Sequence, residues 1–220
     1  MKDAVKVLLL GIVCAVAVIL LNLDKFKSPV EHPDLPYKVY RVEIPSSSYE
    51  TKINRIVRQL ITNENASDFS KYKIIHDWVC DYVEYDYSGL SSNSWLGTLN
   101  DPKYVLETGL AVCGGYMRLY TDLCRAAGLT CDNLTGYGDG FNASTPHGWN
   151  RIKLDGKYYQ VDTTWDDGDN SYGWFAVGYK RLLSEGRRYD GLLEVDDNDY
   201  VIDRDSLEKY EFSTSVKKSN

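Results

Sequence analysis

The dipeptide Asp155-Gly156 is the feature that most constrains the fold, because it stands between two segments in which apolar and polar side chains alternate. Asp-Gly in this setting is a strong signal for a two-residue turn that joins antiparallel strands. With these two residues as the loop, Leu154 faces Lys157, and this pair sets the register of the whole hairpin. We therefore predict an antiparallel sheet built around this turn.

The predicted register brings a histidine and an aspartate within reach of each other. It places Trp149 opposite Asp162 and His147 opposite Thr164. Because side chains alternate between the two faces of a strand, His147 and Asp162 lie on one face as diagonal neighbours. An imidazole and a carboxylate that orients it can therefore meet here.

A cysteine at the predicted start of a helix supplies a third group. The run Gly109–Tyr116 leads from a turn into an amphipathic helix that ends at Gly128. The first N–H groups of a helix are unpaired and its dipole is positive at that end, so a thiolate at Cys113 is favoured over the thiol. The alternative is a buried cysteine that only packs. The presence of His147 and Asp162 favours the nucleophile.

These three groups fit one reaction scheme. Cys113 acts as nucleophile, His147 takes or shares the thiol proton, and Asp162 holds the imidazole in the useful tautomer. The thiolate–imidazolium pair attacks an amide or ester carbonyl, and the acyl-enzyme passes its acyl group to an amine or to water. The sequence leaves that choice open. It also does not identify the oxyanion-hole donor needed besides the Cys113 N–H.

The order and spacing of these motifs resemble the transglutaminase-like superfamily, especially its bacterial extracytoplasmic members, from about Lys71 to Phe175. The matching segments are Ile75–Val79 with Tyr85-Asp86, Gly109–Tyr116, His147–Asn150 and Val161–Asp166. Gly148 stands where many relatives carry alanine, a mild departure that leaves the backbone looser.

The resemblance implies an α+β fold of the papain-like, transglutaminase-core type. In that fold the Cys113 helix packs on an antiparallel β-sheet whose adjacent strands carry His147 and Asp162. The implied function is thiol-dependent acyl transfer or hydrolysis on protein or peptide amides through this triad and a thioester. Hydrolysis or generic acyl transfer is slightly favoured over protein cross-linking. The alternative is a catalytically silent module that keeps the fold and binds a peptide or a cell-wall component.

Four aromatic residues have two interpretations. Tyr116, Trp149, Trp165 and Trp78 either line a channel for the acyl substrate or belong to the core. Aromatic residues at helix or strand spacing fit both, so substrate binding by these residues stays a hypothesis.

The remaining cysteines are expected to be structural. Free thiols are the default for Cys80, Cys124 and Cys131, and the alternative is one disulfide among them, whose pairing the sequence does not give. The absence of paired Cys-x-x-Cys spacings argues against zinc. The acidic run from Asp166 to Asn170 is interpreted as a solvated loop rather than a calcium loop, because its ligand spacing differs from that of an EF-hand. No cofactor or metal is expected.

The other two histidines are not assigned to the site. His76 lies beside the apolar stripe of its helix, which suggests a hydrogen-bonding residue at the surface or its boundary. His32 falls in a segment interpreted as a linker.

The N-terminus is predicted to be a signal anchor. Lys2 and Lys6 precede an apolar run from Val7 to Leu21, so residues 1–23 have the layout of a membrane anchor. We expect it to hold the catalytic domain outside the cytoplasm. A cleaved signal peptide and a secreted protein are the alternative.

The rest of the chain divides into a linker and one domain. Residues 24–36, with three prolines, form the linker, and residues 37–220 form the catalytic domain, with its core at about 71–175. Helices are expected near 51–61, 71–83 and 102–108, and a strand near 37–44. The tail, residues 213–220, is expected to be frayed.

Net charge limits the partners. The chain has 220 residues and a formal charge of -7, which argues against nucleic acid because its phosphates require basic surfaces. We expect a monomer whose partners are a protein or peptide substrate and, through the N-terminal helix, a membrane.

Overall fold

The computed structural model describes residues 34–91, 97–138, 145–169, 171–189, 191 and 193–214. All the elements below belong to one compact unit that runs from His32 to Tyr200 and resumes at Arg204. The predicted anchor, residues 1–23, and His32 lie outside the described residues. Within the described ranges, no helix combines the length and the apolar character that a membrane span needs.

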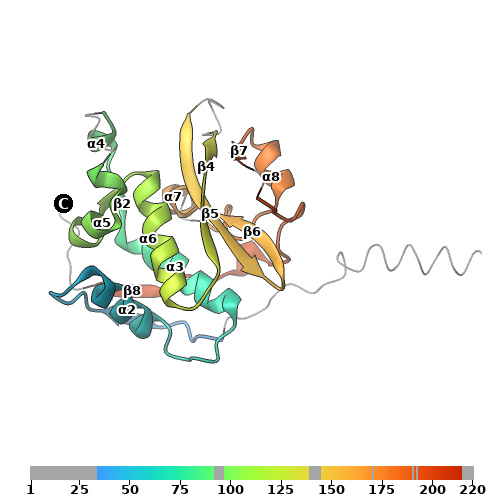
Figure 1. Cartoon of the computed structure of the whole chain (residues 1–220). Coiled ribbons are helices and arrows are strands. Elements are labelled where there is room, and N and C mark those ends of the chain that lie inside the picture. The colour runs from blue at the N-terminus through green and yellow to red at the C-terminus, as the bar shows by residue number, and fades with distance from the viewer. Residues whose placement is uncertain are drawn as a thin grey trace, which may run out of the picture. The chain divides into compact units, whose positions relative to one another are not determined.

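Helices and strands are interspersed along this unit (Figure 1). The described helices are α2 (Tyr49–Leu60), α3 (Asp68–Tyr82), α4 (Tyr87–Ser91), α5 (Pro102–Thr108), α6 (Cys113–Ala126), α7 (Thr163–Asp169) and α8 (Tyr179–Ser184), with 3-10 turns η3 (Thr98–Asn100) and η4 (Arg204–Ser206). The described strands are β1 (Val39–Val42), β2 (Glu84–Tyr85), β3 (Leu110–Ala111), β4 (Cys131–Tyr137), β5 (Pro146–Leu154), β6 (Lys157–Val161), β7 (Arg188–Tyr189) and β8 (Glu211–Thr214).

An antiparallel sheet in the order β6-β5-β4-β7 forms the centre of the unit. The predicted hairpin is confirmed: Leu154 pairs with Lys157. Asp155 and Gly156 adopt positive φ angles of 49° and 81°, as a two-residue hairpin turn of this hand requires. Mixed helix and sheet agree with the predicted α+β class.

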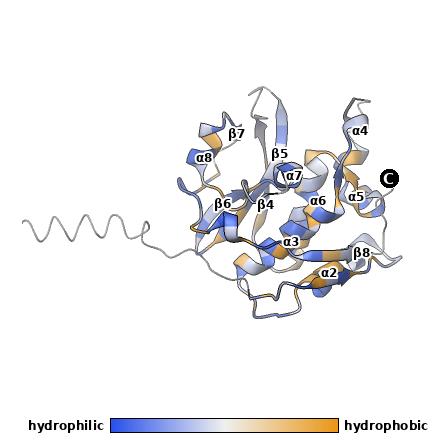
Figure 2. Ribbon diagram, turned by 180° about the vertical axis from the view of Figure 1, so that it is seen from behind, coloured by the Kyte–Doolittle hydropathy of each residue, from blue (hydrophilic) through white to orange (hydrophobic). Residues whose placement is uncertain are grey.

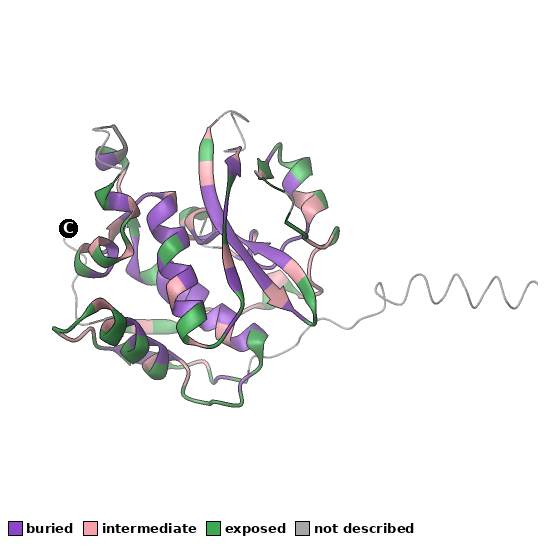
Figure 3. Ribbon diagram, in the orientation of Figure 1, coloured by how far each residue is buried: buried purple, intermediate pink, exposed green. Residues whose placement is uncertain are grey.

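Each face of the sheet is covered by a different part of the chain. Helix α6 lies against β4 and β5 on one face. On the other face, a buried cluster joins the sheet to α8 and to the segment before it, and its members are Leu134, Trp149, Trp174, Val177 and Leu182. Figure 3 shows that burial is concentrated in α3, α6 and the middle of β4 and β5. The sheet is thus the middle layer of the unit.

The amphipathic helices follow the sequence pattern. Helix α2 buries its predicted apolar face through Ile53, Ile56, Val57 and Leu60, whereas Ile61 ends the helix and is half-buried. Figure 2 shows hydrophobic and hydrophilic residues interspersed along this helix, as expected when one face is packed and the other solvated.

One prediction at the end of a strand is wrong. Residues 163 and 164 do not continue β6, because α7 begins at Thr163, so His147 does not face Thr164. The side chain of Asp162 accepts a hydrogen bond from Trp165 N at 3.2 Å, and its carbonyl accepts one from Asp166 N at 3.1 Å. This is the geometry of a helix N-cap, which turns the chain from strand to helix.

The tail is also more ordered than its polar composition predicts. Ser213 and Thr214 belong to β8, which pairs in parallel with Arg41 and Val42 of β1. Just before the strand, Tyr210 is buried and stacks on Tyr37, with 4.8 Å between the ring centroids. Backbone pairing needs no apolar side chains, so the composition concealed this strand. Residues 215–220 lie outside the described residues.

Candidate active site

Cys113 is the first residue of α6. The helix cap and the glycine stop that the sequence predicts are both present in the segment before it. Asp101 caps α5 by accepting from Lys103 N at 3.0 Å, and Gly109 ends that helix in the left-handed conformation at φ 73°. Strand β3 then pairs with β2, and Val112 is extended. Valine carries no side-chain acceptor, so no side-chain cap competes for the N–H groups of the first turn of α6, whose dipole is positive at that end.

Two glycines let the start of α6 approach η3 closely. A Cβ at Gly114 would overlap the Asn100 side chain, and one at Gly115 would overlap the Leu99 carbonyl. Neither position has room for a side chain. The glycines thus seat the first turn against η3, while Cys113 itself stays partly exposed.

The structure brings His147 and Asp162 together. Nε2 of His147 lies 2.7 Å from Oδ2 of Asp162, and the Asp162 side chain is 2% exposed. The imidazole also stacks on Trp149, with 5.7 Å between centroids. Because Nε2 is engaged by the carboxylate, Nδ1 is the nitrogen left for the hydrogen bond between His147 and Cys113.

The electrostatics of the three groups favour an ion pair. Burial raises the pKa of the Cys113 thiol, but the hydrogen bond and charge of His147 outweigh it and hold that pKa below its ordinary value. Burial lowers the pKa of His147, yet Asp162 raises it to about 9. Burial also raises the pKa of Asp162, and His147 and Arg187 bring it below its usual range. The shifts of Cys113 and His147 both favour a thiolate beside an imidazolium.

Asn150 fixes the strand that carries His147 to the helix that carries Cys113. Its Nδ2 donates to the carbonyl of Met117 at 2.9 Å and to Oγ1 of Thr121 at 2.8 Å, and the side chain is fully buried. These bonds hold β5 at a set height along α6. Sequence reasoning quoted Asn150 as part of a motif but gave it no role.

Gly148 also faces α6. A Cβ there would lie 3.1 Å from the sulfur of Met117, which is the far end of a flexible side chain. An alanine at this position therefore fits if the Met117 thioether moves slightly.

Arg187 is a member of the site that sequence reasoning missed. Its Nη1 donates to Oδ2 of Asp162 at 2.7 Å, and the residue is 1% exposed. Arg187 lies beyond Phe175, where the motif resemblance ends, in a stretch without apolar periodicity. No local signal pointed to it.

The four aromatic residues considered for substrate binding differ in how far they are buried. Trp78 and Tyr116 are fully buried and Trp149 is 1% exposed, so these three follow the packing interpretation and offer no surface to a substrate. Tyr116 donates its hydroxyl to Oδ2 of Asp167 at 2.7 Å, which ties α6 to α7. Trp165 is half-buried, with its ring centroid 6.0 Å from that of His147.

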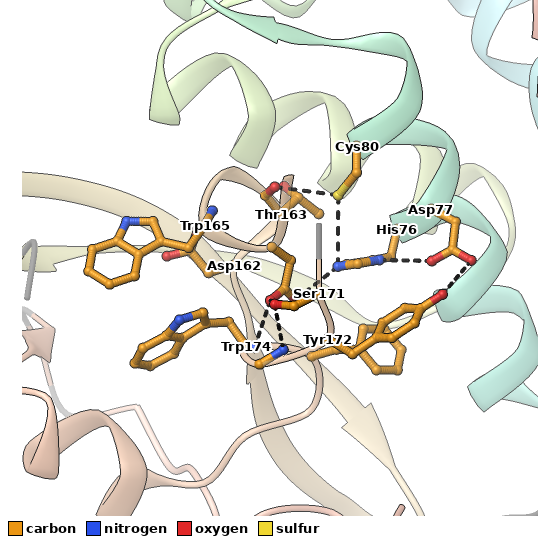
Figure 4. A network of polar contacts seen from close by, with 12 residues as sticks. His76, Asp77, Cys80, Asp162, Thr163, Trp165, Ser171, Tyr172 and Trp174 are labelled. Carbon is orange, nitrogen blue, oxygen red and sulfur yellow. Dashed lines mark hydrogen bonds and ion pairs between the residues drawn. The ribbon is translucent and has the colours of Figure 1, made fainter. Parts of the chain in front are cut away.

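A second cysteine, histidine and aspartate cluster lies inside the unit (Figure 4). Nδ1 of His76 is 3.0 Å from Oδ1 of Asp77, and Nε2 is 3.0 Å from Oδ2 of Asp166. Cys80 Sγ is 3.9 Å from the same Nε2, and its thiol donates to the Thr163 carbonyl at 3.4 Å. His76 is fully buried, so its predicted place at the surface or its boundary is wrong, because α7 covers that side of α3.

The predicted solvated loop is wrong for the first residues of the acidic run, which belong to α7. Asp166 is buried within α7 and accepts from Trp174 N at 2.8 Å as well as contacting His76. Asp167 receives the Tyr116 hydroxyl. Composition suggested exposure, but specific donors compensate the burial of these carboxylates. Asn170 lies outside the described residues.

The remaining cysteines are as predicted. Cys80, Cys124 and Cys131 are free and buried. Among the residues whose positions are described, no group of three or more His, Cys, Asp or Glu side chains is arranged to hold a metal ion.

Comparisons with known proteins agree with the motif pattern. Kyphoscoliosis peptidase of Mus musculus is 32% identical over 124 residues, which is 53% of this chain and 18% of that protein. The Homo sapiens protein of the same name is 29% identical over 138 residues, 58% of this chain and 20% of that protein. The chain thus spans about a fifth of the length of these curated relatives.

Solved structures show weaker similarity. A protein from Cytophaga hutchinsonii proposed to be a cysteine protease aligns with a TM-score of 0.43 and 22% identity over 55% of this chain and 40% of that chain. A protein described as a TGase aligns with a TM-score of 0.40 and 21% identity over 54% of this chain and 34% of that chain.

The family itself is identified by a sequence model. The model of the transglutaminase-like superfamily matches residues 54–177, which include Cys113, His147 and Asp162. That match covers more than half of the 220 residues. The resemblance carried by the motifs is therefore confirmed, and the chain belongs to the transglutaminase-like superfamily.

Proposed function

We propose that this protein is a cysteine enzyme that transfers the acyl group of protein or peptide amides to an amine or to water. One observation carries the proposal. Cys113 begins α6 with a lowered pKa, beside a His147 whose Nε2 is held by Asp162 at 2.7 Å. A thiolate, a proton donor and an orienting carboxylate are the groups that acyl transfer through a thioester requires.

The first half of the reaction forms the thioester. The Cys113 thiolate attacks the carbonyl carbon of the amide, and the carbonyl electrons move to oxygen. The N–H groups at the start of α6 face the negative charge that develops there. His147 then gives its proton to the leaving nitrogen, the C–N bond breaks, and an amine or ammonia departs from the acyl-enzyme.

The second half restores the enzyme. Neutral His147 removes a proton from an amine or a water molecule, which attacks the thioester carbon. The C–S bond breaks, the new amide or acid leaves, and the thiolate–imidazolium pair returns. Asp162 stays ionised throughout and stabilises the imidazolium each time it forms.

The choice between water and an amine sets the reaction class. A site that admits water hydrolyses the thioester, whereas one that shields it until an amine arrives transfers the acyl group. The curated relatives are named as peptidases, which supports peptide hydrolysis over cross-linking as the leading activity.

The experiment that tests the proposal is intact mass spectrometry of the purified full chain with an unfolded, glutamine-containing protein and a biotinylated primary amine. Attachment of the amine indicates transamidation, and deamidation or backbone cleavage indicates hydrolysis. Each change must disappear in Cys113→Ser. If iodoacetamide labels Cys113 no faster than an ordinary exposed thiol, and none of these products appears, the protein is a silent binding module instead.

We also propose that residues 1–23 anchor the domain to a membrane and leave it outside the cytoplasm. The support is the apolar run after Lys2 and Lys6. Protease added to intact cells should remove the domain, while the protein stays with the membrane fraction after an alkaline wash. Release of the protein by the wash would favour secretion after cleavage. So would a mature protein that lacks residues 1–23.

A further inference from the structure

Arg187 is held in place by the backbone on both sides. It follows the turn at Gly186, where φ is 72°, and its N–H donates to the Leu182 carbonyl at 3.0 Å. The next residue starts β7, which pairs with β4. Across from it, Gly138 passes so close that a Cβ there would lie 2.8 Å from the Cα and Cγ of Arg187. The stem of the side chain has little freedom to move.

The guanidinium packs against two indole rings whose planes stand at 83° to each other. Its central carbon is 3.2 Å from the ring centroid of Trp165 and 3.8 Å from that of Trp174. Rings at this angle border the flat cation from two directions, and a planar guanidinium can stack on an indole face in a way that the compact ammonium of lysine cannot. The orientation of Arg187 is therefore set by its aromatic neighbours.

Arg187 directs one of its donors at Asp162 and leaves others unused. Nη1 meets Oδ2 of Asp162 at 2.7 Å, while Nε and Nη2 are buried and have no hydrogen-bond partner among the described residues. Leaving buried N–H groups unpaired costs stability, so this arrangement is a poor one for an arginine whose purpose is to strengthen the fold. Its one directed contact is with the carboxylate that binds His147.

The Asp162 carboxylate is enclosed by donors from separate segments. Arg187 Nη1 and His147 Nε2 both lie 2.7 Å from Oδ2, and Trp165 N donates to Oδ1 at 3.2 Å. Two cations therefore share one carboxylate charge at the same oxygen. Rotation of the carboxylate would break the contacts with Arg187 and Trp165 together.

We propose that Arg187 is a positioning residue of the Cys113 site. It fixes the Asp162 carboxylate in the orientation that receives His147, and by sharing its charge it limits how strongly His147 is held as the imidazolium. This inference rests on the proposed function and adds to it a residue that acts through Asp162 without touching the substrate.

Other charged groups face this pair and would remain when Arg187 is changed. Cys113 faces His147 from α6. Asp166 of α7 lies near both Asp162 and Arg187, Glu185 near Arg187, and Tyr85 of β2 near Cys113 and Asp162. Loss of the Arg187 cation removes a like charge from the surroundings of His147, so the imidazolium should persist to higher pH.

Alkylation of Cys113 by iodoacetamide measures this without a known substrate. The rate is expected to rise in two steps with pH, first when the ion pair forms and again when His147 loses its proton and leaves a more basic thiolate. In the wild type the upper step is expected at about pH 9, because Asp162 raises the pKa of His147 to about 9. Peptide mapping by mass spectrometry on the full chain assigns the label to Cys113.

Three variants separate positioning from simple stability. In Arg187→Met the upper step should move up by roughly half a unit to one unit, as expected for loss of one nearby cation. Arg187→Lys keeps the charge, so its upper step should stay at the wild-type pH, although the rate of labelling at neutral pH falls. Arg187→Gln also removes the charge but keeps a polar side chain, so the same shift is expected if Arg187→Met does not fold.

Arg151→Met is the matched control. Arg151 is also buried, pairs with Asp132 through Nε at 3.1 Å and Nη2 at 2.6 Å, and stacks on Tyr158 at 4.1 Å. This control should lose thermal stability without moving either step. An upper step that stays at the wild-type pH in folded Arg187→Met or Arg187→Gln would overturn the proposal, as would an equal shift in the control.

The two proposals fail in different ways. If wild-type Cys113 shows no enhanced labelling that depends on His147, the proposed function fails and the role of Arg187 fails with it. If the wild type shows both steps and folded Arg187 variants keep them unchanged, the enzyme proposal stands and only the inference about Arg187 is refuted.

Discussion

Two clusters of cysteine, histidine and aspartate in this molecule contain the same residue types and differ in chemistry. Cys113 begins a helix and is partly exposed, whereas Cys80 lies near the end of α3 and is 6% exposed. A helix dipole favours a thiolate at its start and disfavours one at its end. Burial keeps the pKa of Cys80 above its ordinary value despite His76, while His147 brings that of Cys113 below it.

The histidines differ in how many carboxylates they meet. His147 has one, at Nε2, which leaves the other ring nitrogen for the thiol. His76 has one at each nitrogen, Asp77 and Asp166, so its imidazole joins two carboxylates instead of activating Cys80. A catalytic arrangement therefore depends on which partners are absent as well as on which are present. The Cys80 cluster is interpreted as a structural link between α3 and α7.

The sharpest way to break this comparison is to remove each sulfur in turn. Cys113→Ala should abolish turnover and leave the fold intact, because the nucleophile is lost and a small partly exposed side chain is replaced. Cys80→Ala should keep turnover within a few-fold and lower the free energy of unfolding by about 1 kcal/mol. Product formation and thermal melting on both variants check this. Retained turnover in Cys113→Ala would place the nucleophile elsewhere.

The carboxylates give the next largest contrast. Asp162→Asn should lower kcat by about a hundredfold or more with little change in KM, because His147 loses its orienting anion while the binding surface stays. Asp166→Asn should lower the melting temperature and change kcat far less, because the side-chain contacts of Asp166 are with His76 and Trp174 and not with His147. Steady-state kinetics against pH on both variants distinguishes them. An unchanged kcat in Asp162→Asn would remove Asp162 from the proposed triad.

His76 makes a pH-dependent contribution to stability. Burial lowers its pKa, but Cys80, Asp166 and Asp77 outweigh burial and raise it well above the ordinary value. A folded-state pKa above the unfolded one gives stability that is full below the unfolded pKa of about 6.5 and is lost as pH rises through the folded value. Removal of one partner from a buried ion pair costs about 3 kcal/mol.

We therefore expect His76→Gln to be less stable than the wild type by about that amount near pH 6, and the difference to shrink in alkaline solution. Urea unfolding of both proteins across this range measures it. A difference that grows with pH would mean that His76 is neutral in the folded protein.

The smallest effect is expected at Gly148. An alanine Cβ would press on the Met117 sulfur at 3.1 Å, and the thioether can move aside. Gly148→Ala should change the free energy of unfolding by less than about 1 kcal/mol and keep most activity. Melting and turnover measure this. Loss of activity with an unchanged melting temperature would show that the backbone beside His147 needs the freedom of glycine.

Local patterns predicted much of the fold and of the site. The Asp155-Gly156 turn, the cap and stop of α5 at Asp101 and Gly109, and the helix start at Cys113 depend on neighbouring residues, so their signals lie within a few positions. The pairing of β1 with β8 joins segments about 170 residues apart and leaves no such signal.

What the sequence concealed depends on distant partners. Arg187 meets Asp162 from 25 positions away, and its indole neighbours come from α7 and from the segment that follows it. His76 was misplaced because a helical pattern shows which residues are apolar and not which later element covers them. Asp166 was misplaced because a charged residue is expected at the surface only when the interior offers it no hydrogen-bond donors, and here it does.

The dual role of Asp162 has a consequence for the newly made chain. Its carboxylate orients His147 and also caps α7, so it is in place only once that helix exists. Cys113 is synthesised before His147, Asp162 and Arg187, and until they arrive and fold it is an ordinary thiol. On the proposed function, the unfinished chain would therefore carry no activated nucleophile, and its reactivity would first appear when the last third of the domain has closed around the site.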